Sequence, residues 1–224
     1  EQIPRDTTKQ LGVELSGQWT PCVASSKAKA RRNVWPKSTN TRSISRAGRF
    51  FVDLGGSMPA TSLGDSKYVM TCVDDSSRFK IVRVLKKKSD AAAALRNIIA
   101  EYITPAGLKI GSIRADEGGE FEGEFQQVLD SHGITHEFKH PDTPQYNGVA
   151  ERALRLLREN YITMLQEMSM AASDRLWVEV LNHTCDMSNM YVTSSLKGGT
   201  SPYEKWYGRS SSLQHLQPFG TVSY

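Results

Sequence analysis

Three acidic residues lie where a protein of mixed helices and strands could use them together. Asp53 interrupts the apolar run 50–54, Asp116 follows a short apolar segment, and Glu151 stands near the start of a long amphipathic stretch. A carboxylate in an apolar strand is costly to bury unless it is paired or binds a cation. Such oxygen ligands suit Mg²⁺ or Mn²⁺ and do not suit zinc. The three acids are therefore candidates for a two-ion site that activates an attacking oxygen and stabilises the leaving oxygen of a phosphodiester.

The spacing of these acids does not identify them on its own. Asp116 and Glu151 are 35 positions apart. About two acid pairs are expected at that offset by chance in a chain with 24 acidic residues among 224. A solvated surface carboxylate is the ordinary role of any one acid. The assignment therefore depends on the elements that position the acids and on the residues around them.

Hydrophobic periodicity predicts the elements that would bring the acids together. Three strands joined by turns are expected first, followed by helices and strands in alternation. The expected strands are 50–54, 67–73, 79–85, 109–114 and 135–139, and the expected helices are 91–103, 123–131, 149–168 and 174–191. This order predicts an α/β fold with a mixed five-stranded sheet and helices on both of its faces. Strand ends and helix starts in such a sheet converge on one rim, where the three acids would meet.

The residues around two of the acids form a specific pattern. Residues 116–121 read DEGGEF, and residues 143–152 read TPQYNGVAER. Both segments resemble the signature of retroviral and retrotransposon integrases, in particular the copia type, which usually reads DNGGEF and TPQQNGVAER. The strand and hairpin around Asp53 and the segment SPYEKWYG at 201–208 are similar to the same family. The resemblance covers about residues 45–224 and implies an RNase H-like fold.

The resemblance also implies roles for individual residues. Asp53, Asp116 and Glu151 match a D,D,E triad that binds two Mg²⁺ or Mn²⁺ ions. Gln145 and Asn147 match a loop that approaches the DNA end. A core of this family is a polynucleotidyl transferase that performs 3′-end processing and strand transfer. Its expected partners are the double-stranded DNA of element ends and target and further copies of itself in a homo-oligomer.

Basic residues on the predicted long helix extend this interpretation. The resemblance places Arg152 and Arg155 where the family's helix offers basic residues to DNA. Glu151, Arg155 and Arg158 fall at i, i+4 and i+7 and share one helical face, so the arginines can neutralise phosphates beside the carboxylate. The alternative is ion pairing within the helix, for example of Arg155 with Glu151 or Glu159.

Charge is unevenly distributed along the chain, whose formal net charge is +4. Residues 1–49 carry ten basic and three acidic side chains, a balance of +7, and residues 50–224 have a balance of −3. We therefore expect a basic arm over 1–49 and a catalytic core over 50–224. Such an arm either binds nucleic acid or is a solvated tail. Its candidate DNA-binding residues are Lys27, Lys29, Arg31 and Arg32.

Two features depart from the family pattern. Glu117 replaces the usual Asn beside Asp116 and adds negative charge next to the site. The family's upstream zinc module uses two His and two Cys, whereas here Cys22 matches one Cys, Trp19 occupies its partner's position and residues 1–18 contain no His. Four zinc ligands cannot be assembled from this stretch, so zinc is not expected. The alternative function is a catalytically silent, decayed or domesticated core that only binds DNA, and an RNA–DNA hybrid nuclease ranks after it.

Composition excludes several other classes of protein. No apolar run approaches the roughly 18 residues that a membrane span needs, and no membrane partner is expected. The N-terminus has no hydrophobic signal segment. Three widely spaced cysteines do not form a disulfide framework, which favours a reducing compartment, nuclear or cytoplasmic. The resemblance implies a core embedded in a longer polyprotein.

Overall fold

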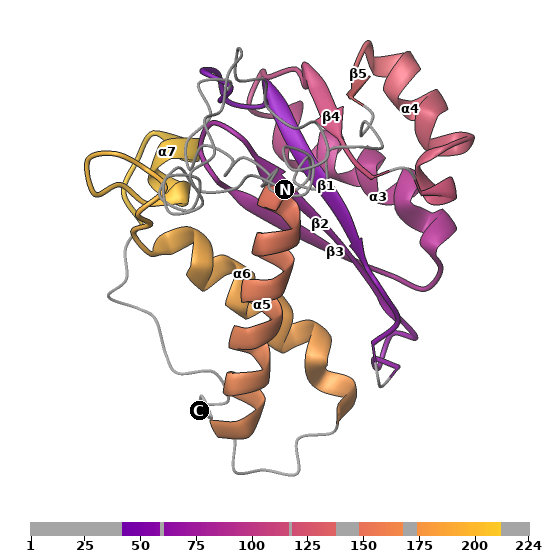
Figure 1. Ribbon diagram of the computed structural model, residues 1–224, viewed down its shortest axis with the longest axis vertical. Coiled ribbons are helices and arrows are strands. Elements are labelled where there is room, and N and C mark those ends of the chain that lie inside the picture. The colour runs from indigo at the N-terminus through magenta and orange to yellow at the C-terminus, as the bar shows by residue number, and fades with distance from the viewer. Residues whose placement is uncertain (1–41, 59–60, 117, 138–147, 168–173, 212–224) are drawn as a thin grey trace, which may run out of the picture. The chain divides into compact units, whose positions relative to one another are not determined.

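The chain divides into two units, Glu1–Asn40 and Thr41–Tyr224, and all described residues belong to the second. The computed structural model (Figure 1) describes residues 42–58, 61–116, 118–137, 148–167 and 174–211. The basic arm lies almost wholly outside these residues. The expected boundary between arm and core at residue 49 therefore stays a prediction.

Five strands form one mixed sheet (Figure 1). β1 (Arg49–Gly55), β2 (Tyr68–Asp74) and β3 (Lys80–Leu85) are antiparallel neighbours. β4 (Ser112–Arg114) runs parallel to β1, and β5 (Thr135–Glu137) runs parallel to β4, which makes the strand order β3-β2-β1-β4-β5. The predicted mixed five-stranded α/β sheet is confirmed.

Helices cover both faces of the sheet (Figure 1). α3 (Ala91–Ile98) and α4 (Glu124–His132) pack on one face. α5 (Gly148–Glu167) and α6 (Trp177–Met190) pack on the other face. Each face has its own apolar core, as a sheet layered between helices requires. None of the helices in the described ranges is both long enough and apolar enough to cross a membrane.

Alternate residues of β1 face the two cores. Phe50 and Val52 are buried in the core under α3 and α4. Phe51 is buried on the opposite side, where it packs against Ala150 of α5. This alternation follows the two-residue period of a strand. Asp53, two residues beyond Phe51, therefore faces α5.

The structure differs from the expected elements mainly at their ends. α3 continues as one π-helical turn over Ile99–Ile103, and β4 and β5 contain only three residues each. The structure also contains a short helix that was not predicted, α7 (Pro202–Tyr207). It begins after Ser201, whose hydroxyl accepts a hydrogen bond from the Glu204 backbone N–H. Its Trp206 is buried on the α3 face and Trp177 is buried on the α5 face. Both tryptophans are core residues.

Candidate active site

The register of the sheet brings Asp53 and Asp116 side by side. β1 and β4 are parallel neighbours, with Phe51 opposite Arg114. Asp53 lies two residues further along β1, and Asp116 lies two residues beyond the end of β4, so both acids lie at the same edge of the sheet. Both residues are partly buried. The convergence of these two acids, expected from the order of elements, follows from this register.

α5 lies across the same face and carries Glu151. Ala150 in its first turn packs against Phe51. Leu154, one turn further, reaches Gly55, where an added Cβ would lie 3.3 Å from Leu154 Cδ2. Glycine in a strand permits this close approach of helix and strand. Glu151 itself is exposed in the first turn of the helix.

The pKa of Asp53 indicates that the acids lie within electrostatic reach of one another. Burial raises the pKa of Asp53 above its ordinary value, and the negative charge of Asp116 raises it further. A hydrogen bond with the Leu54 backbone opposes this rise, while Glu151 and Glu120 add to it. A partly buried carboxylate among other carboxylates holds its charge at a cost, which a divalent cation would remove.

The donor chemistry of this cluster fits a hard cation, because every candidate ligand is a carboxylate. Within the described ranges, however, no group of three or more His, Cys, Asp or Glu side chains is close enough to hold one ion. The acids thus affect one another's charge without forming a three-ligand group within these ranges.

Glu120 is a fourth acid that the sequence analysis did not single out. It affects the pKa of Asp53 and forms an ion pair with Lys88, whose Nζ lies 3.1 Å from its Oε1. The available signal was its place in the segment DEGGEF, four residues after Asp116. It adds negative charge near the three candidate acids.

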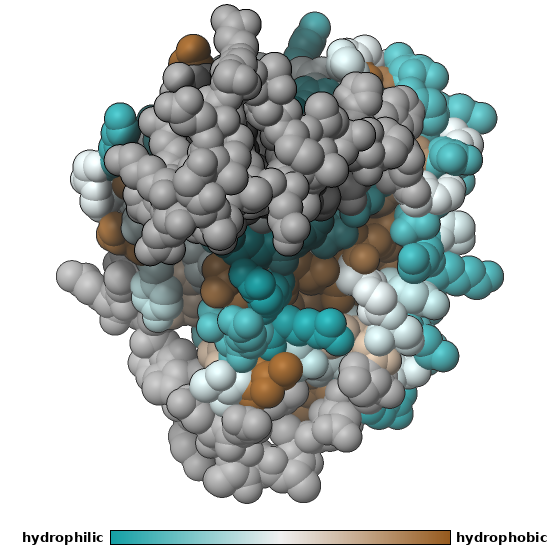
Figure 2. Space-filling view, viewed as in Figure 1, coloured by the Kyte–Doolittle hydropathy of each residue, from teal (hydrophilic) through white to brown (hydrophobic). Residues whose placement is uncertain are grey.

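The basic residues predicted on the long helix keep access to solvent. Arg152, Arg155 and Arg158 are exposed, whereas Leu157 between them is buried. Hydrophilic side chains lie over α5 on the face shown in Figure 2. Arg155 forms no ion pair with the acids one turn away on this described helix. The alternative of helical ion pairing for this arginine is therefore not observed.

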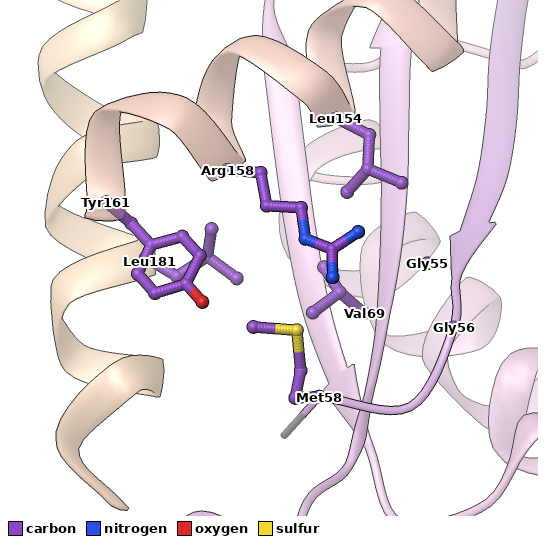
Figure 3. A pocket seen from close by; sticks show the side chains of 8 residues that line it. All are labelled: Gly55, Gly56, Met58, Val69, Leu154, Arg158, Tyr161 and Leu181. Atoms are coloured by element: carbon purple, nitrogen blue, oxygen red, sulfur yellow. The ribbon is translucent and has the colours of Figure 1, made fainter. Parts of the chain in front are cut away.

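Arg158 also lines a small pocket between α5 and the sheet (Figure 3). Its side chain extends from α5 toward Val69, so its methylene stem covers apolar surface. The enclosed volume is about 20 Å³, which is enough for about one water molecule. The other lining residues are Gly55, Gly56, Met58, Leu154, Tyr161 and Leu181. The pocket is thus a packing feature and is too small for a nucleotide.

The remaining residues predicted from the sequence lie outside the described ranges. They are Gln145, Asn147, Lys27, Lys29, Arg31, Arg32, Glu117, Cys22 and Trp19. Their roles in DNA contact, the effect of the acid beside Asp116 and the expected lack of a zinc module stay predictions.

A network of ion pairs borders the site and was not anticipated. Glu137 on β5 accepts hydrogen bonds from Ser112 Oγ at 2.6 Å, Arg49 Nε at 3.0 Å and Arg114 Nε at 2.9 Å. Burial alone would raise the pKa of Glu137, but the bonds from Ser112 and Arg114 outweigh it and hold the pKa below its ordinary value. One carboxylate thus links β1, β4 and β5, and the first two of these strands position two of the acids. No local pattern marks the network, because its members are far apart in the chain.

Comparison with known proteins identifies relatives of the chain in sequence and in fold. No family model matches the chain. The chain is 32% identical over 189 residues to the retrovirus-related Pol polyprotein from transposon TNT 1-94 of Nicotiana tabacum, a match that covers 84% of this chain and 14% of the polyprotein. It is 27% identical over 192 residues to the corresponding polyprotein from transposon RE2 of Arabidopsis thaliana, covering 84% of this chain and 13% of that one. The chain therefore spans about one seventh of the length of these curated relatives.

Solved structures share the fold. A chain of the simian T-cell lymphotropic virus intasome, determined in complex with PP2A regulatory subunit B56 gamma, is similar with a TM-score of 0.66 and 18% identity, covering 90% of this chain and 69% of that one. The catalytic core domain of BIV integrase is similar with a TM-score of 0.53 and 18% identity, covering 71% of this chain and 93% of that one. The chain is thus a homologue of one segment of copia-type retrotransposon Pol polyproteins and has the RNase H-like fold of retroviral integrase catalytic cores.

Proposed function

We propose that this chain is the catalytic core of an integrase that uses two divalent cations to trim the 3′ ends of element DNA and to join them to target DNA. The observation that carries the proposal is the parallel pairing of β1 with β4, which brings Asp53 and Asp116 to one edge of the sheet, with Glu151 in the first turn of the helix that packs on that face. Carboxylates that lie close together repel one another, and this repulsion costs stability unless a bound cation offsets it. Homology to retrotransposon Pol polyproteins supports the same reaction class.

The three carboxylates that would hold the cations are positioned in two different ways, two by the sheet and one by a helix. Asp53 belongs to β1 and Asp116 follows β4, and backbone hydrogen bonds set the register of these neighbouring strands. Glu151 belongs to a helix, and its distance from the sheet depends on side-chain packing. The cations, when bound, supply positive charge that activates the attacking hydroxyl and stabilises the leaving oxygen. Water is the nucleophile in end trimming and a DNA 3′-hydroxyl is the nucleophile in joining, so each step exchanges one P–O bond for another.

The partners of the proposed reaction are double-stranded DNA and further copies of the chain. Arg152 and Arg155, exposed beside Glu151, are positioned to neutralise phosphates of the bound strand. Two DNA ends must be joined to one target, and a homo-oligomer supplies two active sites for them.

The test is a strand-transfer assay with the element's own terminal sequence and Mg²⁺ or Mn²⁺. Asp116→Asn and Glu151→Gln should each abolish transfer, as EDTA should in the unmodified chain. Glu159→Gln is the matched control, because it removes an exposed acid from the same helix away from the triad. Activity that persists in either triad variant, with the fold intact by circular dichroism, would refute the proposal.

A titration with Mn²⁺ separates the proposed enzyme from the catalytically silent alternative. The proposed site binds Mn²⁺ in the unmodified chain and loses that binding in Asp116→Asn. A silent core that only binds DNA shows no Mn²⁺ binding that depends on this residue.

A further inference from the structure

A second concave surface lies where β2 begins and β3 ends. Its volume is about 730 Å³, within the range of about 300–1,000 Å³ that is typical of ligand pockets. Lysine and arginine supply four positive charges to its wall, against one negative charge from an aspartate. The lining residues are Thr61, Asp65, Lys67, Lys86, Lys87 and Arg175.

The ammonium groups of the three lysines form no ion pair with a described acid, although the Lys87 backbone N–H donates to the Asp90 carboxylate at 2.9 Å. Lys67, Lys86 and Lys87 are exposed, and none takes part in an ion pair within the ranges that the structure describes. Lys88, the next residue, differs because it binds Glu120. Like charges that share one concave wall repel each other, and a bound anion relieves that repulsion.

Backbone hydrogen bonds hold the frame of the pocket in place. The Lys67 N–H donates to the Leu85 carbonyl at 2.9 Å, which places Lys67 beside Lys86 at the paired ends of two strands. On the other wall, the Leu63 N–H donates to the Arg175 carbonyl at 3.2 Å and ties the loop before β2 to the 3₁₀ turn Asp174–Leu176 that precedes α6. The origins of the lysine side chains are therefore fixed, while their ammonium ends can follow a ligand.

We infer that this cationic pocket binds the phosphate backbone of nucleic acid, as a second contact for the DNA on which the proposed active site acts. The inference rests on the proposed function. Lysine suits this task because it is a compact point charge on a flexible stem and can meet phosphates in varied positions. The segment that lines the pocket continues into Lys88, which reaches Glu120 in the loop after Asp116. Contacts of this kind give affinity without base specificity.

The salt dependence of DNA binding tests the inference. Binding of a DNA duplex is measured from about 50 to 200 mM salt in EDTA for the unmodified chain, for Lys86→Gln/Lys87→Gln and for Lys109→Gln/Lys197→Gln. The last variant is the control, because it removes the same charge from two exposed lysines outside the pocket. Loss of two phosphate contacts should reduce the slope of log K against log salt by about 2 in the pocket variant only. All three chains should show the same urea midpoint.

Two outcomes would overturn the inference. In the first, the pocket variant and the control have equal slopes. In the second, inorganic tripolyphosphate binds through Lys86 and Lys87 while the DNA slope is unchanged, which would make the pocket a site for small anions. Neither outcome bears on the proposed reaction, because the measurement excludes divalent cations and catalysis is tested separately with Asp116→Asn.

Discussion

Gly55 determines how closely α5, and with it Glu151, approaches β1. A Cβ at this position would lie 3.3 Å from Leu154 Cδ2, 3.6 Å from Leu154 Cδ1 and 3.5 Å from the Val69 carbonyl oxygen. Carbon atoms pack best at about 3.5–4.0 Å, so alanine fits only if Leu154 moves by a few tenths of an ångström. Valine places two more methyl groups at the same point and requires the helix to move.

We expect Gly55→Val to lower the free energy of unfolding by about 1–3 kcal/mol, the usual cost of overpacking. Gly55→Ala should stay within about 1 kcal/mol of the unmodified chain, because the reduced backbone entropy of the unfolded state offsets the close contact. Leu154→Ala removes the obstructing methyl groups. The double variant Gly55→Val/Leu154→Ala should therefore be more stable, by about 1 kcal/mol or more, than the two single effects added together.

Urea unfolding of the four chains measures this coupling, and strand transfer measures its effect on the site. Glu151 lies one helical turn before Leu154, so a displaced helix moves the carboxylate. A misplacement of about 1 Å can cost roughly 100-fold in rate, and we expect a loss of that order in Gly55→Val with partial recovery in the double variant. Additive stabilities, with no coupling between the two positions, would refute the view that this contact sets the position of α5.

Three further predictions follow from the pKa shifts. The folded-state pKa of Asp53 lies above its unfolded-state value, so ionisation of this carboxyl costs stability as pH rises. Asp53→Asn should therefore raise the urea midpoint of the metal-free chain at pH 7. The gain should vanish at about pH 2.5, where the carboxyl is protonated in both the folded and the unfolded state. The pKa of Glu137 is lowered instead, so the ionised Glu137 carboxylate stabilises the fold above its unfolded-state pKa, and this effect is lost as pH falls through the folded-state pKa. Glu137→Gln should lower the free energy of unfolding by about 2 kcal/mol at pH 7. On acidification the variant should lose less stability than the unmodified chain. Burial raises the pKa of Cys72 and of Cys185 to about 12. In a Cys22→Ser chain, which retains only these two thiols, neither should react with a disulfide reagent at about pH 8 until the chain unfolds. Rapid reaction of the folded chain would contradict the burial of the two thiols.

The local pattern of residues was sufficient for most of the elements, and it pointed to the three acids whose catalytic role stays a prediction. Short apolar runs that end at turn residues marked β1 and β2, and alternating apolar residues marked β3. The three-to-four-residue spacing of apolar residues marked α5 with its buried Leu157. These patterns report which side of an element is buried, and burial is the main term that selects secondary structure. The segments around Asp116 and Glu151 supplied the family, because their residue order is far less probable by chance than the spacing of two acids.

Contacts between segments far apart in the chain determined which helix covers which face of the sheet and which side chains meet there. Asp53 meets Asp116 because Phe51 pairs with Arg114, and a shift of one residue would turn Asp53 toward α3. Glu137 and the cationic pocket each combine residues from separate elements. Hydrophobic periodicity carries no information about such partners, because it describes one element at a time. The acids could therefore be named from the chain alone, whereas their mutual approach, the ion pairs beside them and the second basic surface emerged only when the sheet and its helices were assembled.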